Sequence, residues 1–485
     1  MLGEFFKNKG CTFRLSIIIG FCALFLIYYF QLSYASPYAA SWDQVDFALA
    51  LKRYDLLAMQ PHFPGYPYFI LGGTFVNQFV NNPAQALAIF NSIMMLSATV
   101  PIYLLAKRYQ TFSQAWLTTA LIQSSSYMLL IVTQPMSEGA AMAAFWWYGW
   151  SLHLAKENRK FLFQIIPLFL FSIVLGIRLS YLPFVSGILL LWWHEWKILK
   201  SWKRLFILCS FAVFFQLIWL FAVMASEGGV ISFFKLALSF TNGHFHEWGG
   251  TAATDDHSFL QRALTLIFYN IIWTGICSQS FLILFLYTLL LFFIYLKRLT
   301  LKADAWLAMM GIVYFIWALF GQNIDKPRHV IPVAAIILFY LWSYFWRTEL
   351  TLKKMVFATV VLTVQITIGA VDMKKQSDSL PATYQLAYDL EDKREEFVLY
   401  TWEETRVLNY LQVNFPHQEV YRFNIFLQGK SNYKHATIYL TDHVLKGFAE
   451  QGINIENRVK KVRKYKSSKL SDPVYGEITL YKWID

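Results

Sequence analysis

The sequence predicts an all-α polytopic membrane bundle of about eleven transmembrane helices, followed by a small α/β domain. Three observations support this fold class. Hydrophobic residues make up 57% and charged residues only 15% of the 485 positions, whereas a soluble domain is nearer half apolar and a quarter charged. Apolar runs long enough to cross a bilayer recur up to residue 371. Beyond residue 373, charged residues become frequent and short strand-like and helix-like segments alternate.

Each predicted span is an apolar run close to the roughly 20 helical residues needed to cross about 30 Å of hydrocarbon. The runs cover residues 13–33, 84–106, 112–133, 137–156, 161–177, 179–196, 203–225, 277–296, 303–321, 329–346 and 354–371. The further apolar stretch 260–275 is expected to be a half-helix or a kinked lead into the eighth span. We therefore assign residues 1–373 to a membrane domain, with long loops at 34–83 and 226–260.

The distribution of Lys and Arg orients the predicted bundle. With the N-terminus in the cytoplasm, the cytoplasmic flanks carry eighteen Lys and Arg residues and the outer loops carry six. Cytoplasmic loops of membrane proteins show such an excess. The sequence thus predicts a multi-pass protein of the plasma membrane, with both long loops and the C-terminal domain outside. The net charge of +12 follows this distribution, which is that of a membrane protein and not of a nucleic-acid-binding protein.

Residues 374–485 are predicted to form an extracytoplasmic α/β domain. Strand-like runs cover 397–402, 419–423, 437–441, 458–465 and 477–483, and helix-like runs cover 403–414 and 443–451. Alternation of this kind is typical of a small α/β fold. The segment contains no glycine-rich phosphate loop and no tandem repeat. We interpret it as a packed outer cap or as an acceptor-binding module.

The first outer loop concentrates polar groups next to the membrane. Asp43 and Asp46 stand three residues apart, so they share a face if this segment is helical. Its apolar residues suggest a helix that lies in the membrane interface. Three prolines and a glycine in residues 61–67 then predict a stiff turn, which carries His62 and Tyr66. The aspartates are candidate general bases and the turn residues candidate substrate-binding groups. The alternative is that the aspartates are solvated surface charges and that His62 is a turn residue.

A second set of candidates is cationic. Arg178 stands at the outer junction of the fifth and sixth spans. The mouth of the tenth span carries three more groups, against the positive-inside trend: Lys326, Arg328 and His329. Charges at this depth are costly, and Arg and Lys suit phosphate oxygens, so these residues are candidates for binding an anionic substrate. The alternative for Arg178 is that its side chain extends to the lipid headgroups.

Glu138, which opens the fourth span, is a further candidate catalytic carboxylate. Alternatively, its negative charge stabilises that helix by its position near the helix N-terminus. The loop 226–260 contains metal-capable residue types, namely His244, His246, Glu247, Asp255, Asp256 and His257. Their spacing matches no closed metal site, so a flexible, solvated substrate loop is favoured. We assign no metal ligand and expect no required cofactor, and a divalent metal ion is left open.

Four segments carry a family resemblance. They are 42–46 (WDQVD), 61–67 (PHFPGYP), 176–178 (GIR) and 326–332 (KPRHVIP). Together they resemble the GT-C superfamily of polyprenyl-phosphate-sugar-dependent glycosyltransferases, which includes protein O-mannosyltransferases and aminoarabinose transferases. The likeness covers the whole chain at the level of its architecture: one span, an outer loop with aspartates, a bundle of many helices and an outer C-terminal domain. Two departures leave the base assignment between Asp43 and Asp46 open: Phe63 stands where the family has a proline, and two residues instead of one separate the aspartates.

The resemblance implies an inverting glycosyltransferase. A sugar would move from a polyprenyl-phosphate donor in the membrane to an extracytoplasmic polymer, lipid or protein. One aspartate would take the acceptor proton, a role worth about 10²–10⁴-fold in rate, and Arg178, Lys326 and Arg328 would hold the phosphate. The alternative is a secondary transporter or a flippase of lipid-linked glycans, which would place ionisable groups at the bilayer midplane and show inverted repeats. A non-catalytic subunit that keeps the fold is a third interpretation.

Overall fold

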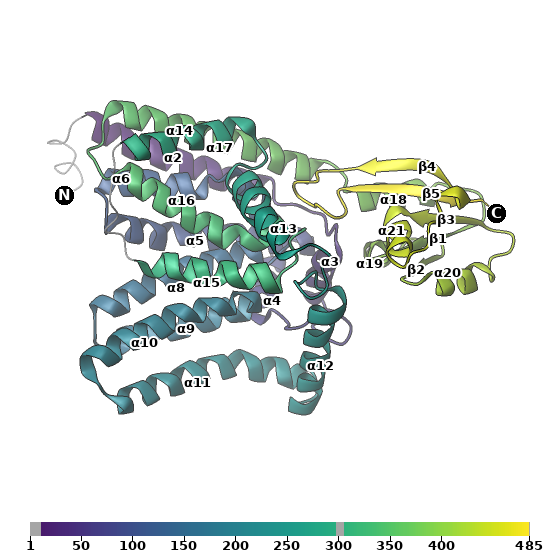
Figure 1. The fold of residues 1–485 in the computed structure, drawn as a ribbon, viewed down its shortest axis with the longest axis horizontal. Coiled ribbons are helices and arrows are strands. Elements are labelled where there is room, and N and C mark those ends of the chain that lie inside the picture. Colours follow the sequence, from purple (N-terminus) through teal and green to yellow (C-terminus); the bar gives the residue numbers. More distant parts are fainter. Residues whose placement is uncertain (1–10, 297–304, 485) are drawn as a thin grey trace.

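The structure, a computed structural model, describes residues 11–296 and 305–484. A long bundle of helices makes up most of the molecule, and a smaller domain with a β-sheet adjoins one end of it (Figure 1). The start of α2, the first described helix, lies at the opposite end of the bundle (Figure 1). Five of the basic residues used to orient the bundle lie outside the described residues: Lys7, Lys9, Lys297, Arg298 and Lys302.

The bundle is built from α-helices joined by short 3₁₀ and π-helices. Its elements are α2 (Cys11–Ser33), α3 (Trp42–Ala50), α4 (Pro67–Asn77), α5 (Pro83–Lys107), α6 (Phe112–Gln123), α7 (Ser126–Val132), α8 (Glu138–Glu157), α9 (Phe161–Ile177), η1 (Leu179–Phe184), α10 (Val185–Leu199), α11 (Trp202–Ser226), α12 (Val230–Gly243), η2 (His244–Trp248), α13 (Phe259–Leu264), η3 (Thr265–Ile276), α14 (Phe281–Leu296), α15 (Ala305–Gly321), η4 (Pro327–Val330), α16 (Ile331–Phe345) and α17 (Leu352–Asp378). Local signals set several starts. Asn82 caps α5, whose first residue is Pro83, and Ser258 and Gln261 form a capping box at α13.

The apolar helices make this a multi-pass membrane protein. Among the described residues, five helices are long and apolar enough to cross a membrane, or up to seven if each bent pair forms one span. One pair is α6 with α7, bent by 61°, and the other is α13–η3 with α14, bent by 104°. The second bend agrees with the half-helix or kinked lead predicted at 260–275. Helices α9 and α15 are apolar but shorter, so the predicted number of eleven spans stays a prediction. The run predicted at 303–321 begins in residues that are not described.

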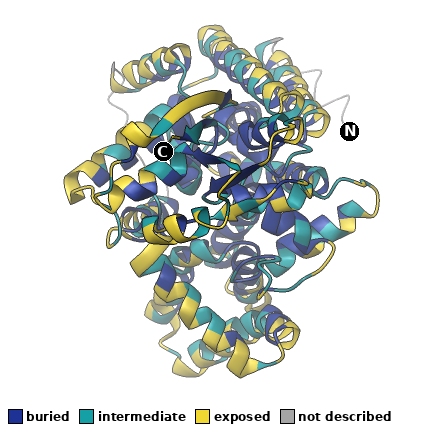
Figure 2. Ribbon diagram, turned by 90° about the vertical axis from the view of Figure 1, so that its right-hand side faces the viewer, coloured by how far each residue is buried: buried dark blue, intermediate teal, exposed yellow. Residues whose placement is uncertain are grey.

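The outer helices expose apolar side chains. Phe206, Val213 and Phe221 of α11 are examples, each more than half exposed. Figure 2, which looks onto the end that carries the sheet domain, shows exposed residues on the outer helices around a buried centre. Apolar surface of this extent is typical of a membrane-facing protein, which agrees with the predicted spans.

The C-terminal part is a three-layer domain. Its elements are α18 (Ala382–Glu391), β1 (Phe397–Thr401), α19 (Glu404–Leu411), β2 (His417–Glu419), α20 (Phe423–Lys430), β3 (Thr437–Thr441), α21 (Asp442–Glu450), η5 (Glu456–Arg458), β4 (Val459–Lys466) and β5 (Glu477–Trp483). The strand order is β2-β1-β3-β5-β4, with β1 parallel to β2 and β3 and the remaining pairs antiparallel. Apolar residues of α18 and α19 cover one face of the sheet, and those of α20 and α21 cover the other.

The observed elements of this domain differ from the predicted ones in three places. The strand expected at 419–423 ends at Glu419, because Phe423 begins α20. The sequence did not predict α18 or α20. Helix α17 continues to Asp378, so the boundary predicted after residue 373 falls inside that helix. Strands β3 and β5 coincide with the predicted runs.

Helix α3 lies between the bundle and the sheet domain. Its residues Val45 and Ala48 are buried in a cluster with Ala84 of α5 and Val407 of α19. The expectation that this helix lies in the membrane interface is therefore wrong, because the sheet domain covers its apolar residues. The loop 226–260 is also not the flexible segment that was favoured, since it contains α12 and η2.

Candidate active site

Asp43, in the first turn of α3, faces an arginine of the tenth predicted span. Arg328 Nη2 donates a hydrogen bond to Asp43 Oδ2 at 3.0 Å, and 32% of the Asp43 side chain is exposed. Within the described part of the chain, Asp43 Oδ1 accepts no hydrogen bond. Burial would raise the pKa of Asp43, but the nearby charges of Lys326, His62 and Arg328 outweigh it and hold this pKa below its ordinary value. Asp43 is thus an ionised carboxylate with one unpaired oxygen.

Arg328 and Arg178 meet at one buried carboxylate. Glu138 Oε1 lies 2.9 Å from Arg328 Nε and 3.1 Å from Arg178 Nη2, and the Glu138 side chain is 1% exposed. Arg178 Nη1 also donates to Ser137 Oγ at 2.8 Å. Arg328 therefore links Asp43 to Glu138, and Glu138 links Arg328 to Arg178. The carboxylate of Glu138 therefore lies between two guanidinium groups.

Glu138 is held by charge and by the turn that precedes it. Among the described residues, neither of its oxygens accepts an aligned hydrogen bond, but Glu138 lies in the first turn of α8, where a negative charge is favoured, so that alternative stays open. The turn is fixed by Asn91 of α5, whose Nδ2 donates to the carbonyl oxygens of Gln134 and Met136 at 2.9 and 2.7 Å. Asn91 Oδ1 accepts from the N–H of Ala140 at 2.9 Å. A fully buried amide thus places Glu138 against the two arginines.

The second aspartate of α3, Asp46, has different partners. Its Oδ1 accepts from Arg406 Nε at 2.8 Å, and its Oδ2 lies 3.1 Å from His62 Nδ1. His62 Nε2 lies 2.9 Å from the Tyr66 hydroxyl. Because a carboxylate only accepts, Nδ1 of His62 carries a proton and donates to Asp46. Burial raises the pKa of Asp46, although His62 and Arg406 act in the other direction. The Asp46 side chain is fully buried, so it is closed to a substrate.

The proline-rich turn holds His62 and Tyr66 on α3. Gly65 has a φ of +94°, and a Cβ at this position would lie 2.2 Å from Tyr54 Oη, so only glycine fits. The Tyr54 hydroxyl donates to the carbonyl oxygen of Gly65 at 3.0 Å. Tyr66 itself has a φ of +47°, a strained conformation of the kind found at functional sites. The Phe47 ring packs against the rings of His62 and Tyr66. The stiffness predicted for this turn agrees with these contacts.

The remaining cationic candidates lie around η4. Within the described residues, no carboxylate oxygen lies within 4.0 Å of the Lys326 ammonium, yet Lys326 is the strongest of the charges that lower the pKa of Asp43. The carbonyl oxygen of His329 accepts from the Tyr314 hydroxyl at 2.9 Å. His329 Nδ1 is buried and makes no hydrogen bond with the described residues. Lys326 is therefore the candidate cation with its charge unpaired.

The sheet domain contributes acidic groups to the same region. The Tyr475 hydroxyl donates to Glu403, which lies directly before α19. Burial raises the pKa of Glu403 and of Asp472, and Lys326 acts against burial at both. These residues and Arg406 were not found from the sequence, because no motif surrounds them and their partners are far away in the chain.

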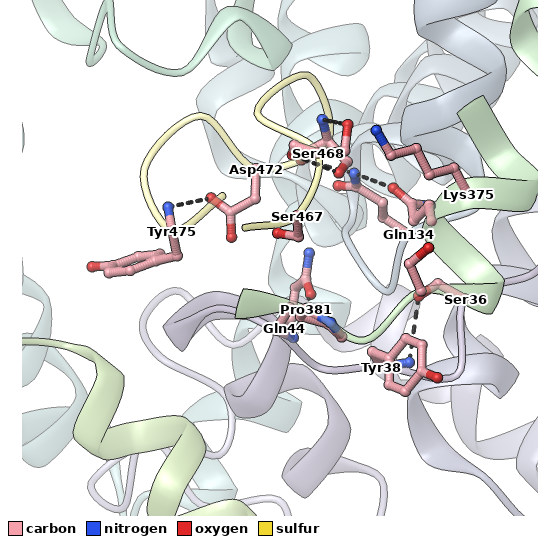
Figure 3. Close-up of a pocket in the computed structure, with 14 residues that line it drawn as sticks. Ser36, Tyr38, Gln44, Gln134, Lys375, Pro381, Ser467, Ser468, Asp472 and Tyr475 are labelled. Carbon is pink, nitrogen blue, oxygen red and sulfur yellow. Dashed lines mark hydrogen bonds between the residues drawn. The ribbon is translucent and has the colours of Figure 1, made fainter. Parts of the chain in front are cut away.

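A pocket opens between the bundle and the sheet domain beside this cluster. It contains about 510 Å³ of empty space, including its open mouth, and its lining includes five serines and three glutamines. Figure 3 shows side chains that come from the segment before α3, from the end of α17 and from the loop between β4 and β5. Gln44, the neighbour of Asp43, is one of them. The pocket therefore borders the candidate site.

Two of the metal-capable residues of the second outer loop, Asp255 and His257, contact each other. His257 Nδ1 lies 2.6 Å from Asp255 Oδ1, and Arg262 pairs with the other oxygen of Asp255. Arg262 also donates to the carbonyl oxygens of Leu319 and Gln322 at 3.1 and 2.9 Å, which anchors the loop at the end of α15. In the part of the chain that the structure describes, no group of three or more His, Cys, Asp or Glu residues is placed to hold a metal ion.

Comparisons with solved structures identify the fold. Two crystal structures of ArnT from Cupriavidus metallidurans, one bound to undecaprenyl phosphate and one in the apo state, align over 96% of this chain and 97% of theirs. The TM-scores are 0.55 and 0.54 at 10% identity. The chain has the GT-C fold. The apo oligosaccharyltransferase of Archaeoglobus fulgidus aligns more weakly, with a TM-score of 0.45, 12% identity, and 87% and 69% of the two chains covered. No protein-family model matches the sequence, and comparison with curated proteins found no sequence match.

The GT-C fold brings together the four segments on which the resemblance was based. Segment 42–46 contacts segment 326–332 through Asp43 and Arg328, and it contacts the proline-rich turn through Asp46 and His62. Segment 176–178 joins them through Arg178, by way of Glu138. The predicted GT-C resemblance is thus confirmed as a fold, and the roles of the individual residues belong to the proposal that follows.

Proposed function

We propose that this chain is a membrane glycosyltransferase that moves a sugar from a polyprenyl-phosphate donor to an acceptor outside the cytoplasm. One observation carries the proposal: Arg328 contacts both the ionised Asp43 and the buried Glu138 that also binds Arg178. A carboxylate able to take a proton therefore lies beside cations able to hold a phosphate. The GT-C fold supports this, since an ArnT of the same fold has been solved with undecaprenyl phosphate.

Arg178, Arg328 and Lys326 are the proposed phosphate ligands. The Nε atom of Arg178 is buried and makes no hydrogen bond with the described residues, whereas Nε of Arg328 lies against Glu138. Buried donors are almost always paired in proteins, and phosphate oxygens are strong acceptors for guanidinium groups. Glu138 is a positioning residue in this scheme, because its charge holds two like-charged side chains together in a buried place.

Asp43 is the proposed general base, in preference to Asp46. Asp43 is partly exposed and has an unpaired oxygen, whereas both oxygens of the fully buried Asp46 are occupied by Arg406 and His62. A base must reach the proton that it removes. Asp46 instead orients the His62–Tyr66 pair and fixes α3 on the sheet domain.

The proposed reaction is a single displacement. The acceptor hydroxyl oxygen bonds to the anomeric carbon as the bond from that carbon to the phosphate oxygen breaks. The electron pair of that bond leaves with the polyprenyl phosphate, and the acceptor proton passes to Asp43. The arginines and Lys326 stabilise the charge on the leaving phosphate. Attack from the side opposite the phosphate inverts the anomeric centre.

The placement of charge favours this function over transport. A transporter needs ionisable groups near the middle of its spans. Here Arg178 follows the end of α9, Glu138 opens α8, and Arg328 lies in η4 before α16. We also propose that these cations meet the phosphate charge without a metal ion, so that activity persists in the presence of a chelator.

The direct test uses purified protein in detergent and a panel of radiolabelled polyprenyl-phosphate sugars. We expect one donor to be consumed with release of polyprenyl phosphate. Asp43→Asn should lower this turnover at least about a hundredfold, and Asp256→Asn, a change at an acidic residue in the second outer loop, should leave it unchanged. The proposed function is wrong if the wild type consumes no donor or if the Asp43→Asn protein is as active as the wild type.

A further inference from the structure

The pocket between the bundle and the sheet domain has walls from both parts of the chain. Gln134, from the turn before α8, donates through Nε2 to Gln376 Oε1 at 2.8 Å and to the carbonyl oxygen of Ser471 at 2.9 Å. This side chain ties the bundle to the β4–β5 loop. Asp472 in that loop is itself fixed, because its Oδ1 accepts from the backbone N–H groups of Val474 and Tyr475. The pocket is therefore a built feature of the domain junction (Figure 3).

The lining is made mostly of residues that have a polar group in the side chain, and its two charges are of opposite sign. Besides its serines and glutamines it carries one ammonium, Lys375, and one carboxylate, Asp472, and no arginine. Several lining groups make no hydrogen bond with the described residues, and they include Gln44 Nε2, Lys375 Nζ, Ser379 Oγ and Asp472 Oδ2. These atoms supply donors and an acceptor in one place. A phosphate would face the Asp472 carboxylate here, whereas a sugar hydroxyl can donate to it and accept from the others.

The pocket is connected to the candidate catalytic cluster. Gln44 is adjacent to Asp43 in α3, and Asp472 lies close enough to Arg328 and Lys326 to interact with their charges. Tyr475 lines the pocket and donates to Glu403, which interacts with the charges of Lys326 and Asp43. The pocket therefore lies near the charged cluster that contains Asp43.

From this arrangement we infer that the pocket binds a neutral, polyhydroxylated part of the acceptor, a sugar unit, and presents one of its hydroxyls to Asp43. The inference rests on the proposed function and deepens it, because it names the chemical class of the acceptor and makes the sheet domain part of the substrate site. The donor and the acceptor would then bind at neighbouring sites that are lined by different types of side chain. The arginine cluster suits a phosphate, and the pocket suits hydroxyl groups.

Binding can be tested without turnover. The probes are three neutral trisaccharides, of N-acetylglucosamine, glucose and mannose, and inorganic tripolyphosphate, each titrated into Asp43→Asn protein in detergent. We expect at least one trisaccharide to bind and to lose at least about tenfold in affinity on Ser379→Trp, which fills the mouth of the pocket, and on Asp472→Asn. Lys374→Ala, on the same turn of α17 as Lys375 but outside the lining, is the matched control. Tripolyphosphate binding should not respond to Ser379→Trp.

Kinetics separate this inference from the proposed function. With an active donor and a sugar acceptor, Lys375→Ala and Ser379→Trp should raise the acceptor KM several-fold and leave the donor KM near wild type. One outcome is that donor is consumed, but these variants change neither the binding of any trisaccharide nor the KM for any acceptor. The pocket inference is then wrong, and the proposed function stands. If trisaccharides bind in the pocket but no donor is ever consumed, the proposed function fails, and with it the acceptor role of the pocket. Lys375 and Ser379 both lie at the exposed end of α17, where substitutions are expected to leave the fold intact. One variant that folds is enough to carry out the test.

Discussion

Asp46 of the first outer loop and Arg406 of the sheet domain form an ion pair across 360 positions of sequence, with Arg406 Nε 2.8 Å from Asp46 Oδ1. The same guanidinium group donates to the carbonyl oxygens of Ala58 and Met59 at 3.2 and 2.9 Å. Its carbon Cζ lies 5.6 Å from the centre of the Trp42 ring, a cation–π distance. One arginine therefore joins α3, which contains Asp43, to the segment that precedes the proline-rich turn.

Arg406→Ala should destabilise the protein, because it leaves Asp46 buried without its cation. Removal of one partner of a buried ion pair costs about 3–5 kcal/mol. The midpoint of thermal unfolding in detergent measures the effect, and Arg394→Ala, at an exposed arginine of the same domain, is the control. The double variant with Asp46→Asn should recover part of the loss, since the unpaired charge is then absent. Equal stability of Arg406→Ala and Arg394→Ala would contradict the role of this pair.

Asp43→Asn should lower kcat by about 10²–10⁴-fold, the usual contribution of a positioned base. Donor affinity should stay near wild type, because the amide keeps the size of the side chain and the phosphate ligands are other residues. Asp46→Asn should give a milder loss of kcat with a lower unfolding midpoint. Initial rates and donor binding, measured on the same preparations, distinguish these outcomes. A larger loss of kcat in Asp46→Asn than in Asp43→Asn would reverse the assignment of the base.

The pH dependence of kcat/KM should report the low pKa of Asp43 in the free enzyme. Burial raises this pKa, but the charges of Lys326, His62 and Arg328 more than offset the effect of burial. The fall in activity on the acidic side of the pH profile, its acidic limb, should therefore lie below the ordinary Asp pKa of about 3.9. Lys326→Ala removes the largest of these charges and should move the limb to higher pH. Because the folded pKa is depressed, Asp43 also contributes stability above its unfolded pKa, which is lost as the pH falls through the folded value. If the acidic limb of the Lys326→Ala protein lies at the same pH as that of the wild type, a group other than Asp43 controls the activity at low pH.

Arg328→Ala should abolish transfer and weaken donor binding, and Arg328→Lys should keep part of both. A lysine supplies the charge without the two-pronged geometry that suits phosphate. Donor KM and kcat are the measurements, and Lys235→Ala, at an exposed outer basic residue on α12, is the control. Donor binding that is unchanged in a folded Arg328→Ala protein would remove Arg328 from the phosphate site.

Orientation can be tested by cysteine labelling in intact cells. In a background without the four native cysteines, single cysteines at Ser41, Ser258 and Ser379 should react with an impermeant reagent, and one at Ser201 should not. The excess of cytoplasmic Lys and Arg motivates this expectation. In the structure, the start of α2 and the sheet domain lie at opposite ends of the bundle (Figure 1), as an inside N-terminus and an outside C-terminal domain require. Labelling at Ser201 alone would invert the topology.

Much of the fold could be predicted because its signals are local. Apolar runs mark the helices of the bundle, and β3 and β5 coincide with their predicted segments. The elements that were predicted wrongly lie where the local sequence fits more than one structure. The strand expected at 419–423 stops early because Phe423 turns inward in α20 and joins the core behind the sheet. Helix α3 was predicted, but its apolar face was assigned to the membrane, since a periodic pattern does not tell whether lipid or another domain covers it.

The candidate site was only partly accessible from the sequence. Asp43, Glu138, Arg178 and Arg328 stood out because charges beside apolar spans are costly. Asn91, which holds the turn before Glu138, looks like any polar residue within a helix. Arg406 stands among other charged residues in a polar domain, where single charges carry no signal.

The sequence alone determined that this is a membrane bundle with a separate polar domain, because hydrophobicity and its period are properties of neighbouring residues. Only the tertiary structure decided what each charge does. Asp43 and Asp46 are three residues apart, yet one pairs with Arg328 across 285 positions and the other with Arg406 across 360. The physical reason is that desolvation and Coulomb energies depend on which groups meet in space, and those partners come from segments that only the packed chain brings together.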